Sequence, residues 1–203
     1  MQSDKARSFN IQPSTFNIMS AAAAGLCWAG ALALLIFGGL SADEPPLAPQ
    51  RLIYYGLVLG AALLTFVPIE RAMGMPGLTV EAVVGAALLF YGLAFVPPPT
   101  DWLLSPPDMP IYALLIGAIF LCGAASARPF LDLIGRHVFR QRIHALDKRR
   151  VRRQSYEIGL LLAALAALAG LRVLTWVSVL LLALALTIAE LLFLARFQAD
   201  PNA

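Results

Sequence analysis

The sequence predicts an all-α integral membrane protein, built as a bundle of six transmembrane helices with both termini on the cytoplasmic side. Composition is the first reason, because 60% of the 203 residues are hydrophobic and the mean hydropathy is +0.77, more than a soluble domain carries. The second is length, since six apolar segments approach the roughly 20 residues that span a hydrocarbon core of about 30 Å. The third is a concentration of basic residues between two of these segments.

The expected spans follow the apolar segments. They cover residues 17–40, 52–69, 78–96, 111–127, 156–171 and 173–195, within a single membrane domain over residues 1–203. The first is too long for a secretory signal, whose apolar core has roughly 7 to 15 residues. The apolar sequence of the last two spans is interrupted only at Gly170-Leu171-Arg172. A merged helix would exceed the bilayer thickness and would move the C-terminus outside, so we expect two antiparallel helices joined at this tripeptide.

Positive charge sets the expected orientation. Nine of the fifteen Lys and Arg residues lie between Arg128 and Arg153, and loops rich in Lys and Arg stay in the cytoplasm. With the N-terminus inside, thirteen basic residues fall on the cytoplasmic side and two, Arg51 and Arg172, fall outside, which predicts an N-in/C-in topology. Arginine outnumbers lysine thirteen to two, and Ala and Leu are frequent. This usage favours the cytoplasmic (inner) membrane of a bacterium with a GC-rich genome.

The basic segment 128–155 is expected to be a cytoplasmic loop that contains a basic amphipathic helix. Pro129 suits a first helical position, and Phe130 and Ile134 begin an apolar face that shifts near Arg140, which predicts one helix that bends there or two short helices. Anionic lipid or an acidic partner would meet the charges of such a helix at the membrane surface. Because this charge serves orientation, we expect no nucleic-acid partner. The candidate patch comprises Arg140, Arg142, Lys148, Arg149, Arg150, Arg152 and Arg153.

Three acidic residues enter the expected spans. Glu81 and Glu157 occupy opening turns, where a carboxylate meets the positive end of a helix, so neither requires a function. Glu190 lies deeper, with Thr187 one turn earlier, and the two form a candidate intramembrane polar site that points into the bundle or to a partner. The alternative is that Glu190 is near enough to the interface to extend into water.

The second outer loop, residues 97–110, is a candidate docking surface. It has six prolines in fourteen residues, and each fixes a backbone dihedral and removes a donor, so the loop should be stiff. Trp102, Leu103 and Leu104 would be its apolar anchor. Two alternatives stay open: the prolines only terminate helices, or the three apolar residues enter the lipid interface.

Small residues predict where helices approach closely. Gly56 and Gly60 form one pair with the spacing that allows close packing, and Ala163 and Ala167 form another. The two cysteines, Cys27 and Cys122, lie in separate apolar segments, and we expect them to pack as hydrophobic side chains rather than to form a disulfide.

Chemistry-bearing motifs are sparse. His137, Arg140, His144 and Asp147 share one helical face, which resembles a catalytic row, but a solvated face has the same pattern. The two histidines are two turns apart, too far to chelate one ion, and no histidine lies in an expected span to ligate haem. We therefore expect no catalytic residue, no metal and no cofactor.

The leading functional hypothesis is a noncatalytic accessory or scaffold subunit of a larger membrane protein complex, with the lipid bilayer and other membrane subunits as partners. One alternative is a small-molecule transport component, a membrane subunit that binds substrate within the bundle. Another is a membrane-embedded lipid-modifying enzyme that uses the row from His137 to Asp147. A polar cavity near the middle of the membrane would favour transport, whereas an apolar bundle with a bare lateral groove would favour the subunit.

Overall fold

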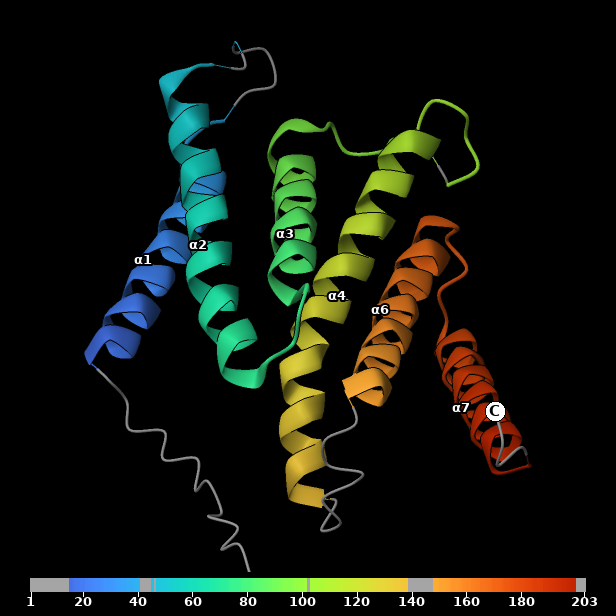
Figure 1. Cartoon of the computed structure of the whole chain (residues 1–203). Coiled ribbons are helices and arrows are strands. Elements are labelled where there is room, and N and C mark those ends of the chain that lie inside the picture. Colours follow the sequence, from blue (N-terminus) through green and yellow to red (C-terminus); the bar gives the residue numbers. More distant parts are fainter. Residues whose placement is uncertain (1–14, 41–44, 46, 102, 139–147, 200–203) are drawn as a thin grey trace, which may run out of the picture.

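The computed structural model describes residues 15–40, 45, 47–101, 103–138 and 148–199 (Figure 1). For residues 15–17, 136–138, 190 and 193–199 the description covers the backbone. The described residues contain no strand and form six α-helices: α1 (Thr15–Phe37), α2 (Pro49–Met73), α3 (Leu78–Phe95), α4 (Met109–Val138), α6 (Lys148–Gly170) and α7 (Trp176–Ala199).

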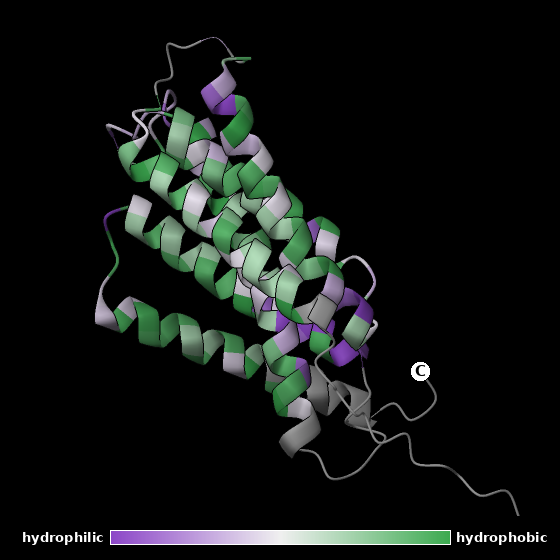
Figure 2. Cartoon of the chain, turned by 90° about the vertical axis from the view of Figure 1, so that its left-hand side faces the viewer, coloured by the Kyte–Doolittle hydropathy of each residue, from purple (hydrophilic) through white to green (hydrophobic). Residues whose placement is uncertain are grey.

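Four of the helices are long and apolar enough to cross a membrane. The stretches are Ile18–Phe37, Pro49–Met73, Leu78–Phe95 and Met109–Gly135, and α7 carries a shorter apolar stretch, Trp176–Ala189. Large hydrophobic side chains are exposed along the outer surfaces of the helices, and strongly hydrophilic residues gather toward one end (Figure 2). A surface of this kind suits lipid and not water. The all-helical class and its membrane character agree with the prediction.

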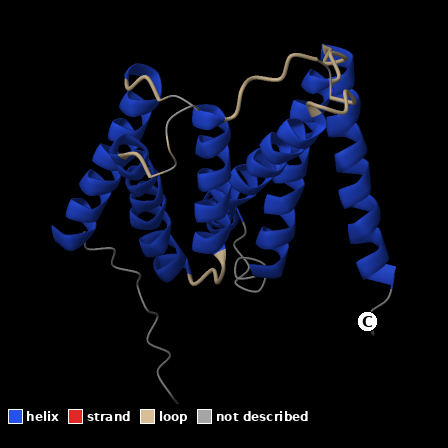
Figure 3. Cartoon of the chain, turned by 90° about the horizontal axis from the view of Figure 1, so that it is seen from above, coloured by secondary structure: helices blue, strands red, loops and turns tan. Residues whose placement is uncertain are grey.

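The helices pack in chain order as an open row. α1 packs on α2, α2 on α3, α3 on α4, and α4 on α6, whereas α7 makes few contacts with α6. Figures 1 and 3 both place α1 and α7 at opposite ends of this row. The contact between α4 and α6 is more extensive than that of any other helix pair. These two helices carry Arg128 and the basic run from Lys148 to Arg153.

Two clusters of buried side chains hold the row together. In the first, which joins α1, α2 and α3, the Tyr54 hydroxyl donates a hydrogen bond to Phe90 O at 3.0 Å, and the Arg51 guanidinium lies 4.5 Å from the centre of the Phe95 ring. The second joins the turn between α2 and α3 to α4 and α6. It contains Met75, Leu78, Ala82, Ala125 and Val151. The second cluster therefore fixes the surroundings of the basic residues.

Glycine sets the closest helix contacts, but at positions other than those predicted. A Cβ added at Gly159 of α6 would lie 2.7 Å from Phe120 O of α4, and one at Gly85 of α3 would lie 2.9 Å from Cys122 N. A Cβ at Gly56 would meet nothing within 4 Å, and one at Gly60 would make an ordinary contact of 3.9 Å with Cys27 Sγ. The prediction of a close approach at Gly56 and Gly60 is therefore wrong, because neither glycine lies so near a neighbouring helix that a Cβ would be excluded.

Two separate antiparallel helices, α6 and α7, lie on either side of the interruption at residues 170–172, as predicted (Figure 1). α6 ends at Gly170, and Arg172 adopts a left-handed backbone conformation with φ of 59°. Val173 N donates to Leu168 O at 3.1 Å and Arg172 N donates to Ala169 O at 2.9 Å, which is the hydrogen-bond pattern that closes a helix C-terminus. Both cysteines are free thiols, also as predicted.

The expected separate helix in segment 128–155 is not what the structure shows. Pro129 lies inside α4, which continues to Val138, and the basic run from Lys148 onward forms the first turns of α6. Residues 139–147 lie outside the described part of the chain. Proline removes one helical hydrogen bond, but Arg128 and Asp132 on either side of it are buried, so tertiary packing keeps α4 continuous through this position.

Candidate functional site

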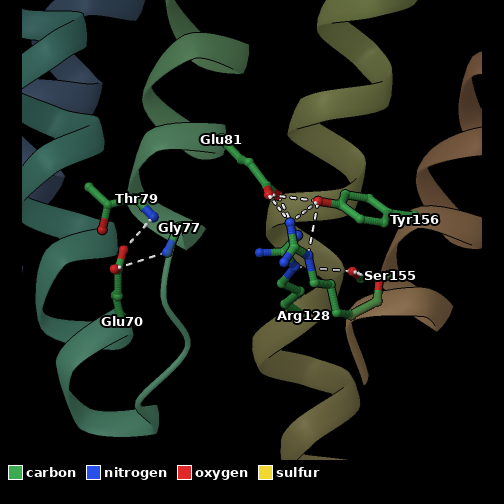
Figure 4. Close-up of polar contacts among 8 residues, drawn as sticks. Glu70, Gly77, Thr79, Glu81, Arg128, Ser155 and Tyr156 are labelled. Carbon is green, nitrogen blue, oxygen red and sulfur yellow. Dashed lines mark hydrogen bonds and ion pairs between the residues drawn. The ribbon is translucent and has the colours of Figure 1, made fainter. Parts of the chain in front are cut away.

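Charged side chains of α3, α4 and α6 meet near the place where α2 ends at Met73, α3 begins at Leu78 and α6 begins at Lys148. We call this region the basic end. Its centre is an ion pair between Glu81, in the first turn of α3, and Arg128 of α4, with 2.5 Å between Oε2 and Nη2 (Figure 4). The side chain of Arg128 is only 3% exposed and that of Glu81 is 17% exposed. A cation this buried requires its counter-charge.

Ser155 connects this ion pair to α6. Arg128 Nε donates a hydrogen bond to Ser155 Oγ at 3.2 Å, and Ser155 Oγ donates to Arg152 O at 2.7 Å. Ser155 is fully buried, so its hydroxyl has been withdrawn from solvent to make these two bonds. One arginine on α4 thus contacts both neighbouring helices of the row.

Tyr156 closes the network from the other side. Its hydroxyl donates to Glu81 Oε1 at 2.8 Å and accepts hydrogen bonds from Nε and Nη2 of Arg152, each at 3.2 Å. The Arg128 guanidinium lies 5.0 Å from the centre of the Tyr156 ring, which stacks on Phe120 of α4 with 5.9 Å between ring centres. We call Glu81, Arg128, Arg152, Ser155 and Tyr156 the polar network.

The turn between α2 and α3 is held against the same end. The Glu70 carboxylate accepts hydrogen bonds from Gly77 N at 3.2 Å and Thr79 N at 2.6 Å, which secures the start of α3 (Figure 4). Lys148 Nζ donates to Gly74 O at 2.7 Å, so the first residue of α6 is tied to the residue that caps α2. Gly74 has φ of 61°, a conformation that glycine adopts without strain.

A small cavity of about 170 Å³ opens beside the polar network. It is lined by Met75, Pro76, Arg128, Lys148, Arg149, Val151 and Arg152. Four of the seven lining residues are cationic, and they come from α4 and from the start of α6. The cavity is therefore suited to an anion. The polar network beside it holds α3, α4 and α6 together.

The structure divides the predicted basic patch. Lys148, Arg149 and Arg152 line the cavity, whereas Arg150 and Arg153 are not among its lining residues. Arg153 Nε instead lies 3.5 Å from Glu157 Oε1, one turn further along α6. The remaining patch members, Arg140 and Arg142, lie outside the described residues, as do His144, Asp147 and the side chain of His137.

Sequence reasoning did not identify Glu81 as the centre of the polar network, although the prediction that Glu81 requires no function is untested. The available signal was the opposite charge of two residues at span ends expected on the cytoplasmic side: Glu81 lies in the opening turn of span 78–96, and Arg128 directly follows span 111–127. The two residues are 47 positions apart in sequence, so no local spacing pairs them. Ser155 and Tyr156 were likewise unrecognised, because a hydroxyl near the start of an expected span is common and carries no signal by itself.

The predicted intramembrane polar site is described in part. Thr187 is exposed, and its hydroxyl donates to Ala183 O of its own helix at 2.8 Å. The side chain of Glu190 lies outside the described residues. Thr187 also lines a groove of about 440 Å³ between α6 and α7, which we call the α6–α7 groove. Its other lining residues are Leu131, Gln154, Glu157, Ile158, Leu161, Ala183, Leu186 and Leu191.

The predicted outer loop, residues 97–110, is held by hydrogen bonds within the loop and by one to the end of α6. Asp108 Oδ2 accepts from Thr100 N at 3.0 Å and from Asp101 N at 2.7 Å, and Leu103 N donates to Gly170 O at 3.1 Å. Of the predicted anchor, Leu103 is half-buried, Leu104 is exposed and Trp102 lies outside the described residues. Docking at this loop stays a prediction.

No protein-family model matches the chain, and neither a curated protein nor a solved structure shows significant similarity to it.

Proposed function

We propose that the chain is a noncatalytic membrane protein that serves as an accessory or scaffold subunit of a larger membrane complex. The observation that carries this proposal is the position of α7, which contacts only a small part of α6 and exposes large apolar side chains such as Leu180, Leu184 and Leu191. A helix at the edge of an open row has most of its surface available for packing against a helix of another subunit.

The α6–α7 groove supports a protein partner at this place. It is mostly apolar but includes Gln154, Glu157 and Thr187. Lipid chains offer polar groups no hydrogen bonds, whereas a partner helix can present polar side chains at matching positions. The partner that fits is therefore a transmembrane helix with an apolar face and one or two hydrogen-bonding residues.

The proposed topology has six spans with N-in/C-in orientation, in the inner membrane of a bacterium. We assign α6 and α7 as the fifth and sixth spans, because the apolar segment 156–171 lies almost entirely within α6 and α7 carries the apolar stretch Trp176–Ala189. The fold supports this orientation by placing the described basic residues unevenly. Arg51 and Arg172 flank one end of the helices, while Arg71, Arg128 and the run from Lys148 to Arg153 lie at the other.

Transport is the second candidate, and the character of the lateral grooves favours the subunit over it. A groove of about 830 Å³ lies along α2 beside Ser20 of α1, and its lining is mostly apolar, as with Leu63, Leu64 and Val67. A secondary transporter binds its substrate near the bilayer midplane between broken helices. The lipid-enzyme alternative depends on His137 and His144, whose side chains lie outside the described residues.

Site-specific photocrosslinking in cells tests the subunit proposal. A photoreactive benzoylphenylalanine at Leu191, which lines the α6–α7 groove, is expected to give one discrete adduct of constant mass. The matched control is Leu160 of α6, which is similarly exposed but does not line the groove, and its yield of that adduct should be several times lower. Equal yields at the two positions, or crosslinks to lipid alone at both, would contradict a subunit contact at α7.

A further inference from the structure

We infer that the cavity at the basic end binds a phosphate group. Its lining brings together Arg128 of α4 with Lys148, Arg149 and Arg152 of α6, while Met75 and Val151 supply apolar walls. Hydrogen bonds from charged donors to phosphate oxygens are among the strongest that side chains make, and guanidinium groups contact phosphate through two parallel bonds. This inference does not depend on the proposed protein partner.

The charge around the cavity favours an anion. Glu81 is the one carboxylate of the polar network as defined above, and it does not line the cavity. It is bound to Arg128 at 2.5 Å and lies 3.9 Å from Arg152, so one negative charge is shared by two of the four lining cations. The excess of positive charge is thus directed at the cavity.

The donors are held in place before any ligand arrives. Arg128 is fixed by Ser155 and Glu81, and Arg152 is fixed by the Tyr156 hydroxyl. Lys148 gives one of its three ammonium N–H donors to Gly74 O. Because these side chains are already ordered, binding an anion costs less conformational entropy than at a flexible basic surface.

Size and position indicate a phosphate group rather than a larger ligand. The cavity volume of about 170 Å³ is below the roughly 300 Å³ at which sites for drug-sized molecules begin. The cavity lies where the apolar part of α2 ends and that of α3 begins, which is the level of lipid headgroups for helices that span the bilayer. The phosphate can belong to the headgroup of an anionic phospholipid or to a soluble phosphate compound.

Native mass spectrometry of the full chain in mild detergent tests the site. We expect the wild type to retain one phosphatidylglycerol molecule in preference to phosphatidylcholine with the same acyl chains. Lys148→Gln should weaken this retention about fivefold, the contribution of one basic residue near an anionic surface. Arg153→Gln is the matched control, because it removes the same charge from the same helix without changing the cavity lining. It should retain phosphatidylglycerol as the wild type does.

Two further measurements distinguish the source of the phosphate and guard against misfolding. If millimolar inorganic phosphate raises the Tm of the wild type but not of Lys148→Gln, the ligand is a soluble phosphate. If phosphatidylglycerol alone does so, the ligand is a lipid headgroup. Arg149→Gln, which also changes the lining, should reproduce the Lys148→Gln result. Equal losses of phosphatidylglycerol in Lys148→Gln and Arg153→Gln would overturn the inference in favour of general charge attraction. Equal retention of the two lipids by a wild type whose Tm inorganic phosphate does not raise would overturn it as well.

Discussion

Glu81→Gln is expected to lower the free energy of unfolding of the detergent-purified protein by about 3 kcal/mol, the scale measured when one partner of a buried ion pair is removed. The reason is the burial of Arg128, whose side chain is 3% exposed and would lose the counter-charge now 2.5 Å away. The Tyr156 hydroxyl would also lose the carboxylate to which it donates at 2.8 Å. Chemical or thermal unfolding followed by circular dichroism measures the change.

Glu157→Gln provides the matched control. Glu157 also pairs with an arginine, Arg153 at 3.5 Å, but both side chains are about one-third exposed and lie one turn apart on the same helix. Such a pair contributes about 0.3 to 0.5 kcal/mol. Adding Arg128→Met to Glu81→Gln should recover much of the lost stability, because the double variant leaves no isolated buried charge. A loss for Glu81→Gln no larger than that for Glu157→Gln would contradict a structural role for the polar network.

Gly159→Ala is expected to destabilise the protein by about 1 to 3 kcal/mol, as overpacking does in tight interiors. The added Cβ would lie 2.7 Å from Phe120 O and 3.1 Å from Ala124 N, and both are backbone atoms of α4 that cannot rotate away. α4 and α6 would have to separate, which would also stretch the 3.2 Å bond between Arg128 and Ser155.

Gly117→Ala is the control for this prediction, because a Cβ there meets nothing within 4 Å. It lies on α4, so replacing glycine by alanine in an open helical position should be neutral or stabilising by up to about 1 kcal/mol. Thermal unfolding of both variants under identical detergent conditions makes the comparison. Equal Tm values for Gly159→Ala and Gly117→Ala would show that α4 and α6 are not in close contact at Gly159.

Sequence alone could predict the features that depend on composition along the chain. The break between the last two helices could be predicted because Gly170 and Arg172 interrupt a long apolar segment. In the structure, Arg172 adopts a left-handed backbone conformation directly after α6 ends. The concentration of basic residues at one end of the helices could likewise be predicted from the sequence. Both follow from local patterns of hydropathy and charge.

Features that depend on contacts between helices could not be predicted in this way. Proline at position 129 is a strong local signal for a helix start, yet burial of Arg128 against α3 and α6 keeps α4 continuous. Glycine spacing favoured Gly56 and Gly60, but the close contacts are at Gly85 and Gly159. The choice between these positions depends on which helix face meets a neighbour, and that information is not local.

Cysteine accessibility in intact cells tests most directly the central claim, that the basic end of this membrane protein faces the cytoplasm. Asp101→Cys lies in the outer loop and Arg149→Cys lies at the basic end, and both native positions are exposed. Labelling is measured with a membrane-impermeant maleimide, above the background from Cys27 and Cys122 in the wild type. We predict that Asp101→Cys reacts in intact cells and that Arg149→Cys reacts only after the membrane is permeabilised. Labelling of Arg149→Cys in intact cells, with Asp101→Cys protected, would contradict the account.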